Sequence, residues 1–218
     1  MSDLPENLAT QLAALQDIPT HRPIILSDAD EVILTFVSAF EAFCETIGLQ
    51  LSLDTLAITG NVTRMEDGTV LTAEEVSAAL GRFFAEGSHH QSPVEGAIEG
   101  LNRLAEDATV IILTNIPFES RAVRQAAMES FGLHHPIIAN SGGKGPAAQA
   151  LTQGISAPSF FIDDLPPNHI SVAKHAPHIE CIHYVADERL NKLMPDAPDI
   201  ALRAKSWAEI EAHIMGRI

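Results

Sequence analysis

The stretch "IILSDADEVIL", residues Ile24 to Leu34, places two aspartates one residue apart directly after an apolar run. The run itself predicts a buried strand over residues 23–27. The apolar residues that follow predict a helix from about Val32 to Ile47. Two carboxylates repel each other and are costly between buried segments. Two aspartates at this point therefore indicate a functional role.

The composition is that of a folded globular protein. The 218 residues are 46% hydrophobic and 19% charged, which is enough for one α/β domain with a smaller insert. A net charge of -16 makes nucleic acid and membrane surfaces poor partners. The charge leaves room for a small anionic substrate, provided that the site supplies a local cation.

No targeting or membrane signal is evident. No apolar run approaches the roughly 20 residues of a membrane span, and the first residues lack a signal peptide's basic and apolar regions. We therefore expect a cytoplasmic protein. Cys44 and Cys181 belong to no C-x-x-C motif, so they are predicted to be buried small residues.

Short β-branched runs alternate with amphipathic segments along most of the chain. This pattern predicts an α/β fold with a doubly wound, mainly parallel, Rossmann-like sheet. The predicted strands cover residues 23–27, 109–114, 136–140, 159–163 and 179–185, with an edge strand at 200–204.

The alternation of strands and helices is interrupted between the first two predicted strands. Residues 36–90 contain two helical segments and an Asp67-Gly68 hairpin signal, far more than a crossover needs. They predict an inserted α+β cap domain, and residues 1–35 with 91–218 form the predicted core. Three capping-box patterns mark expected helix starts, at Thr72–Glu75, Ser92–Glu95 and Ser206–Glu209.

Polar residues follow four of the predicted strands. The carboxyl ends of parallel strands meet at one edge of a sheet, so these side chains are expected in one crevice. In chain order they are Asp28 and Asp30, then Thr114 and Asn115, then Lys144 in "NSGGKGP", then Asp163, Asp164 and Asn168.

Clustered carboxylates are unfavourable unless a cation binds them, and hard oxygen ligands suit Mg²⁺. With the metal present a phosphate can approach, steered by Lys144 and the Thr114 hydroxyl. One aspartate can then attack phosphorus, and another can move a proton.

Four segments in this order, "SDADEV", "LTNIP", "GGKGP" and "FIDDLPPN", resemble the phosphatase branch of the haloacid dehalogenase superfamily with a C1-type cap. The resemblance implies that Asp28 forms an aspartyl-phosphate and that Asp30 acts as general acid and base. It implies that Lys144 neutralises charge between Asp28 and the phosphate. Thr114, Asn115 and Lys144 are expected to contact the substrate.

The resemblance also implies a metal site. Asp28, Asp164 and the backbone carbonyl of Asp30 would bind Mg²⁺. Asp163 would lie behind these ligands or share the metal, and Asn168 would orient a metal water or Lys144.

One departure from the family pattern concerns Glu31, which stands where glycine is common. A glutamate adds charge near the phosphate site and is expected to be excluded from a glycine-only backbone conformation. We expect slower turnover as a result.

The predicted function is a Mg²⁺-dependent phosphomonoester hydrolase acting on a small phosphorylated metabolite. A phosphomutase would share every core residue, and a degenerate member would bind a phosphorylated ligand without turnover. A dehalogenase is disfavoured by Asp30, because displacing halide needs no proton donor there. In a receiver switch the acidic pair follows the first strand and the phosphorylated aspartate follows the third. This chain instead has a second acidic pair after the lysine and a long insert, so a receiver switch is disfavoured.

His89-His90 and His134-His135 are interpreted as surface or hinge residues, because adjacent histidines on an extended segment point to opposite sides. The sequence leaves the substrate and the oligomeric state open.

Overall fold

The structure, a computed structural model, describes residues 4–15, 18–87 and 90–218. Within this part of the chain, six strands form a sheet in which every neighbouring pair runs parallel. In spatial order they are β5 (Ile137–Asn140), β4 (Thr109–Asn115), β1 (Ile24–Ser27), β6 (Ser159–Asp163), β7 (Glu180–His183) and β8 (Leu202–Arg203). All six predicted strands are present, and the predicted α/β fold class is confirmed.

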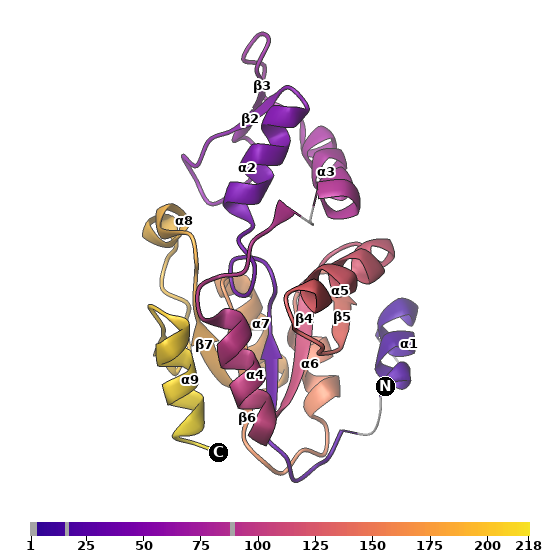
Figure 1. The fold of residues 1–218 in the computed structure, drawn as a ribbon, viewed down its shortest axis with the longest axis vertical. Helices are drawn as coiled ribbons and strands as arrows, with labels where there is room; N and C mark the ends of the chain where they lie inside the picture. Colours follow the sequence, from indigo (N-terminus) through magenta and orange to yellow (C-terminus); the bar gives the residue numbers. More distant parts are fainter. Residues whose placement is uncertain (1–3, 16–17, 88–89) are drawn as a thin grey trace.

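Helices cover both faces of the sheet (Figure 1). Apolar side chains of α4 (Ala97–Asp107), α5 (Arg121–Ser130) and α9 (Trp207–Met215) pack on one face. Those of α1 (Glu6–Ala14), α6 (Gly145–Thr152) and α7 (Pro166–His175) pack on the other. The strands are almost fully buried because both faces are covered, which is why they lack an apolar-polar alternation.

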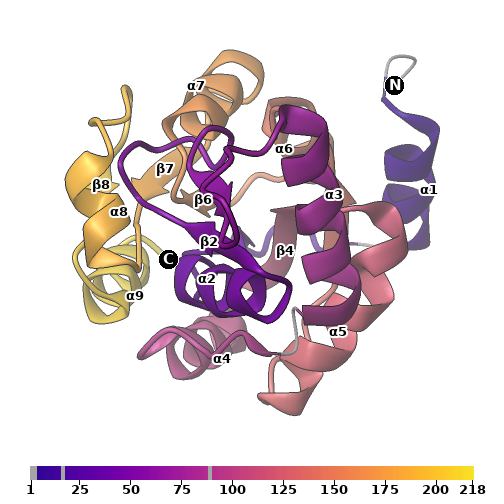
Figure 2. The same cartoon turned by 90° about the horizontal axis from the view of Figure 1, so that it is seen from above.

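A smaller layer lies above the carboxyl ends of the strands (Figures 1 and 2). It consists of α2 (Val37–Thr46), the antiparallel pair β2 (Leu49–Leu51) and β3 (Val62–Arg64), α3 (Ala73–Arg82) and the π-helix η1 (Phe83–Gly87). Gly68 takes a φ of +72° in the turn after β3, where the Asp67-Gly68 signal predicted a hairpin. We call this layer the cap.

The cap does not close its apolar core alone. Its buried cluster of phenylalanine and aliphatic side chains also contains Val185, Leu190 and Met194, from β7's exit and α8 (Glu188–Leu193). The division into a cap of residues 36–90 and a core of the remainder therefore stays a prediction.

Two expected helix starts are wrong. Residues 29–34 form a compact turn closed by Glu31 N–H donating to Leu34 O, so α2 begins only at Val37. The Ser92–Glu95 box is not formed, because Val94 N–H donates to Ile33 O and holds this return segment against the turn. The helix α4 then begins at Ala97, after Gly96 with a φ of +77°.

The other two predicted boxes lie at helix starts. Thr72 and Glu75 cap α3 reciprocally, and the Ser206 hydroxyl accepts from Glu209 N–H at the start of α9. The described helices include none that is long and apolar enough to cross a membrane.

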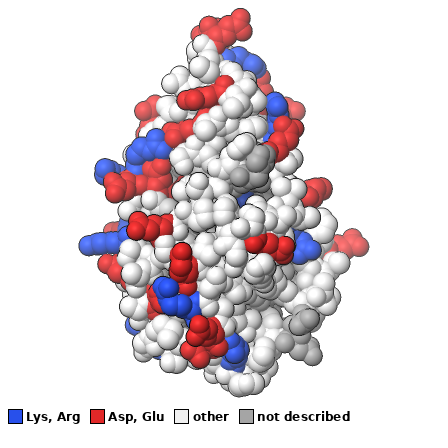
Figure 3. Space-filling view, in the orientation of Figure 1, with Lys and Arg blue, Asp and Glu red and all other residues white. Residues whose placement is uncertain are grey.

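Charged side chains are mixed on the face drawn in Figure 3. Acidic side chains lie at the top, where Figure 1 draws the turn after β3, and lysine and arginine side chains are scattered among acidic ones further down.

Candidate active site

The strand order reverses beside β1, because the chain passes from β1 to β4 and β5 and then returns to β6 on the other side. Loops that follow β1 and β6 therefore separate and leave a crevice at the carboxyl ends. Asp28 follows β1, and Asp163 and Asp164 lie at the end of β6. One carboxylate oxygen from each lies within 4.8 Å of the other two.

Lys144 completes this group, which we call the lysine cluster: Asp28, Lys144, Asp163 and Asp164. Its Nζ lies 2.7 Å from Asp28 Oδ1 and 2.6 Å from Asp163 Oδ2, with the side chain fully buried. Burial alone would lower the pKa of Lys144, but the two carboxylates raise it above its ordinary value. The lysine is therefore a permanent cation.

The glycine-rich loop brings Lys144 this close. A Cβ at Gly145 would overlap the backbone carbonyl of Ser171 in α7, so only glycine lets the start of α6 approach α7 there. Gly142 takes a φ of +79° in the same loop. Two hydrogen bonds hold the loop in place. Asn115 donates to Gly142 O at 3.0 Å, and Asn140 donates to Asn115 Oδ1 at 2.7 Å.

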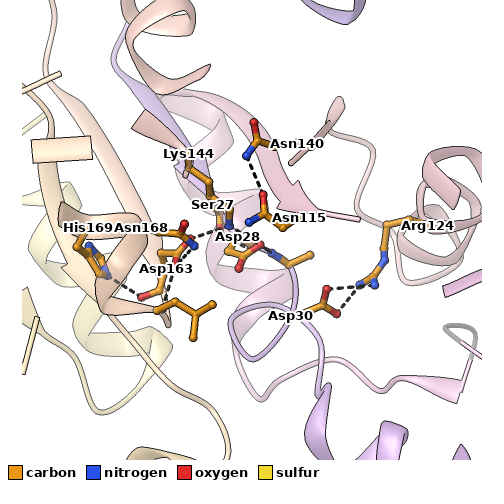
Figure 4. A network of polar contacts seen from close by, with 12 residues as sticks. Ser27, Asp28, Asp30, Asn115, Arg124, Asn140, Lys144, Asp163, Asn168 and His169 are labelled. Atoms are coloured by element: carbon orange, nitrogen blue, oxygen red, sulfur yellow. Dashed lines mark hydrogen bonds and ion pairs between the residues drawn. The ribbon is translucent and has the colours of Figure 1, made fainter. Parts of the chain in front are cut away.

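The two adjacent aspartates differ in their surroundings. Asp163 is fully buried, and its carboxylate accepts from Lys144, from Leu165 N–H at 2.9 Å and from Asn168 Nδ2 at 2.9 and 3.2 Å (Figure 4). Asp164 faces the cavity described below, and among the described residues no side chain or backbone group donates to its carboxylate. Burial raises its pKa well above the ordinary range, and Asp163 and Asp28 add to the effect.

Asp28 has one engaged oxygen and one open oxygen. Oδ1 accepts from Lys144 and from Ala29 N–H at 2.7 Å, and none of the described residues donates to Oδ2. Burial raises the pKa of Asp28 to about 7, although Lys144 opposes the shift. One lysine beside three buried carboxylates leaves the cluster short of positive charge.

A divalent cation with oxygen ligands would supply the missing charge and would favour the ionised forms of Asp28 and Asp164. Both carboxylates are hard donors and both face the cavity, and none of the described residues donates to the carboxylate of Asp164. The residues present therefore suit a hard divalent ion.

Thr114 lies one residue before the end of β4 and lines the same cavity as Asp28 and Asp164, described below. Its side chain is fully buried, and its hydroxyl has no hydrogen-bond partner among the described residues. An unpaired buried hydroxyl costs about 1–3 kcal/mol, so a site that keeps one is suited to a ligand oxygen.

A different set of partners holds Asp30. Arg124 donates to Asp30 Oδ1 at 2.9 Å and to Oδ2 at 3.3 Å, and Gln91 donates to Oδ1 at 2.7 Å. Figure 4 shows this pair apart from the lysine cluster, with the Asp30 carboxylate turned toward Arg124. The guanidinium is almost completely buried and lies 5.6 Å from the ring centre of Phe84 in the cap.

Arg124 and Gln91 were missed from the sequence. The available signal was the position of Arg124 one turn before Met128, because both lie on the buried side of α5. An arginine on such a face needs a buried partner.

Glu31 does not behave as expected. It takes a φ of +57°, so the expectation that a glutamate would be excluded from the glycine-like conformation is wrong. The cause lies in its carboxylate. Oε1 accepts from Phe36 N–H at 2.8 Å and Val37 N–H at 2.7 Å, and Oε2 accepts from Asp187 N–H at 2.7 Å. The first two bonds cap α2, and all three together offset the backbone cost.

Burial raises the pKa of Glu31, and the three backbone donors oppose the shift. We call Asp30, Glu31, Gln91 and Arg124 the hinge cluster. They lie where the chain leaves the core at Thr35, whose N–H donates to Ser92 O, and where it returns.

Two buried histidines support the loop that carries the acidic pair. His169 Nε2 lies 3.0 Å from Asp163 O, and His183 Nε2 lies 2.8 Å from Asp164 O. A carbonyl only accepts, so each imidazole donates. Burial lowers both pKa values, that of His183 to about 4, so both rings are neutral at pH 7.

A cavity of about 280 Å³ joins the cap to these groups. Its floor is formed by Asp28, Asp30, Thr114 and Asp164, and its wall by apolar side chains from the cap. Of the two adjacent histidine pairs, His90, His134 and His135 belong to no cluster of metal-binding side chains among the described residues. His89 lies outside the described residues.

Comparison with known proteins supports the fold. No family model and no curated protein matches the sequence. A haloacid dehalogenase-like hydrolase of Streptococcus pneumoniae superposes with a TM-score of 0.57 at 19% identity, over 89% of this chain and 99% of that one. A provisionally assigned β-phosphoglucomutase of Thermotoga maritima gives 0.56 at 15% identity, over 90% and 100%.

A third structure, a provisionally assigned hydrolase of the same family from Bacillus subtilis bound to magnesium, gives a TM-score of 0.56 at 16% identity, over 89% of this chain and 99% of that one. At these identities the likeness concerns the fold, and the fold expected from the four motifs is confirmed.

Proposed function

We propose that this chain, which has the haloacid dehalogenase-like fold, is a phosphoryl-transfer enzyme that hydrolyses a phosphate monoester. The observation that supports this most strongly is the lysine cluster. It presents an open carboxylate oxygen on Asp28 beside an unpaired buried hydroxyl on Thr114. The same fold in the three neighbouring structures agrees with this chemistry.

Asp28, Asp164 and the backbone carbonyl of Asp30 would hold Mg²⁺. When bound, the ion would neutralise the excess negative charge and polarise a phosphate oxygen. Asp163 would not be a ligand in this proposal, because Lys144, Leu165 N–H and Asn168 already occupy its oxygens. Asp163 instead keeps Lys144 in place.

In the proposed reaction, Asp28 Oδ2 attacks phosphorus and the bond to the ester oxygen breaks. Ala29 N–H and Lys144 hold Oδ1, so the carboxylate cannot rotate away. Lys144 and the Thr114 hydroxyl stabilise negative charge on the phosphoryl oxygens.

Asp30 gives a proton to the departing alkoxide and then accepts one from the water that hydrolyses the aspartyl-phosphate. Arg124 and Gln91 set the direction of this carboxylate. Asn115 holds the Lys144 loop, and its expected contact with substrate stays a prediction.

The cap would select the substrate, because it forms most of the cavity wall. The cytoplasmic location stays a prediction, and the oligomeric state stays open.

The test is phosphate release from an aryl phosphate by purified protein, with Mg²⁺ and after chelation. We expect chelation to remove activity and Asp28→Asn to lower kcat by about 10⁴-fold or more, since it removes the nucleophile. Asp67→Asn, an exposed carboxylate in the hairpin after β3, is the matched control. Release that survives both chelation and Asp28→Asn would refute the proposal.

A phosphomutase is the second candidate, favoured by the fold shared with the Thermotoga maritima structure. Isomerisation of a sugar phosphate without net release of phosphate would identify it.

A further inference from the structure

The wall of the active-site cavity differs sharply from its floor. Four carboxylates line the cavity: Asp28, Asp30, Glu31 and Asp164. None of the described residues that line the cavity is lysine, arginine or histidine. Two buried cations are held beside the reacting groups and away from the apolar wall, because Lys144 pairs with Asp28 and Asp163, and Arg124 pairs with Asp30.

The remaining wall is almost entirely apolar. The described cap residues that line the cavity carry no polar side chain, and Leu165 and Leu190 close the wall from the core. The apolar lining includes Phe36, Leu53, Leu56, Ile58, Phe84 and Leu165. Asn115 is the one amide among the described lining residues, and its side chain is hydrogen-bonded to Gly142 O and to Asn140.

Such a wall discriminates by charge and by hydroxyl content. A second anionic group on the substrate would lie unpaired in an apolar wall near carboxylates, which is strongly unfavourable. Sugar hydroxyls would lose water without gaining partners. An apolar group would instead be stabilised by burial against the leucines and phenylalanines.

We propose that the substrate is the phosphate monoester of a small, uncharged, apolar alcohol, aryl or branched alkyl, without a second anionic group. The inference rests on the proposed function for the reacting end of the molecule. The cavity of about 280 Å³ lies near the lower limit of about 300 Å³ for ligand sites, which suits a single ring or a short branched chain.

A matched pair of substrates tests the charge rule. The pair is 4-methylphenyl phosphate and 4-carboxyphenyl phosphate, which differ in one group on the same ring. The carboxylated phenol is the better leaving group, so intrinsic reactivity favours the charged compound. We expect kcat/KM to favour the methyl compound by about 100-fold. Equal rates, or faster turnover of the carboxylate, of phosphoglycolate or of glucose 6-phosphate, would overturn the inference.

A binding experiment separates this inference from the reaction. Benzylphosphonate and phosphonoacetate cannot be hydrolysed, and their affinities for the Mg²⁺-loaded protein are measured by calorimetry. We expect benzylphosphonate to bind at least about tenfold more tightly. If benzylphosphonate binds more tightly but the protein releases no phosphate from any substrate, the proposed hydrolysis is wrong and the proposed ligand class stands. Tighter binding of phosphonoacetate, or no binding of either, refutes the ligand class.

A charge placed in the wall should reverse the preference. Leu56 lines the cavity and is 40% exposed, so Leu56→Lys is compatible with folding, whereas Val70 is 53% exposed and does not line it. We expect Leu56→Lys to raise the relative kcat/KM for the carboxylated substrate by about tenfold, and Val70→Lys to leave the ratio unchanged. The same change in both variants, or in neither, contradicts the proposal.

Discussion

The lysine cluster and the hinge cluster begin within one four-residue segment, Asp28 to Glu31, but differ in every partner. Lys144 belongs to a loop between core elements, and its carboxylate partners lie at the ends of β1 and β6. The hinge cluster draws its partners from α5, the return linker, the start of α2 and the loop at Asp187.

The difference shows how adjacent residues can serve separate purposes. The lysine cluster is enclosed by the sheet and its helices, so its geometry depends on the core alone. The hinge cluster joins the core to the cap, and Arg124 also contacts Phe84 in η1. We infer that the first cluster holds the nucleophile and the metal ligands, and that the second directs Asp30, the proposed acid and base, and fixes the cap above both.

The largest effect is expected at Lys144. Lys144→Met leaves three carboxylates without their buried cation, and removing one partner of a buried pair costs about 3–5 kcal/mol. We expect a loss of this size in urea unfolding and a fall in kcat of about 10³-fold. Lys174→Met, at an exposed lysine of α7, should change stability by less than about 0.5 kcal/mol. A fully stable Lys144→Met protein would show that the cluster does not depend on its lysine.

A smaller effect is expected at Arg124, because Asp30 keeps 17% of its side-chain surface exposed. Arg124→Met should cost about 2–3 kcal/mol and lower kcat by about 10- to 100-fold, since Asp30 loses its direction. Arg82→Met, at an arginine whose side chain is 53% exposed, is the control.

The Arg124→Met/Asp30→Asn double variant separates positioning from packing. If Arg124 acts through Asp30, adding Arg124→Met to Asp30→Asn will cause little further loss of kcat. Additive losses would place the role of Arg124 elsewhere.

A third comparison concerns Glu31. Glu31→Gln should cost about 1–2 kcal/mol in thermal or urea unfolding, because it weakens the bonds that cap α2. Glu31→Gly relieves the positive φ but removes all three bonds, so we expect it also to be less stable than the natural protein. A glycine variant that is more stable or faster would restore the view of Glu31 as an obstacle.

The smallest effect is a pH dependence behind the lysine cluster. The pKa of His183 is about 4 in the folded protein and about 6.5 in an unfolded chain, so between these values the unfolded state binds more protons. Stability from this group is present above pH 6.5 and is lost as the pH falls toward 4. His183→Gln should flatten the unfolding free energy over this window, whereas exposed His21→Gln should not. Equal slopes in all three proteins would contradict a neutral His183.

Much of the fold could be predicted because local patterns agree with it. The apolar runs at residues 24–27 and 159–163 are buried strands, and the boxes at Thr72 and Ser206 lie at helix starts. The Ser92 box failed because a long-range bond from Val94 N–H to Ile33 O competes with helix formation. Local propensity cannot include a partner sixty residues away.

The sequence by itself determined the parallel sheet and the convergence of Asp28, Thr114, Lys144 and Asp164. Strand ends of such a sheet meet at one edge regardless of side-chain detail. Only the tertiary structure decided that Asp163 holds Lys144 while Asp164 stays open, that Arg124 directs Asp30, and that Glu31 caps α2. Those choices depend on which donors the folded chain brings within about 3 Å of each carboxylate, a distance that sequence spacing does not encode.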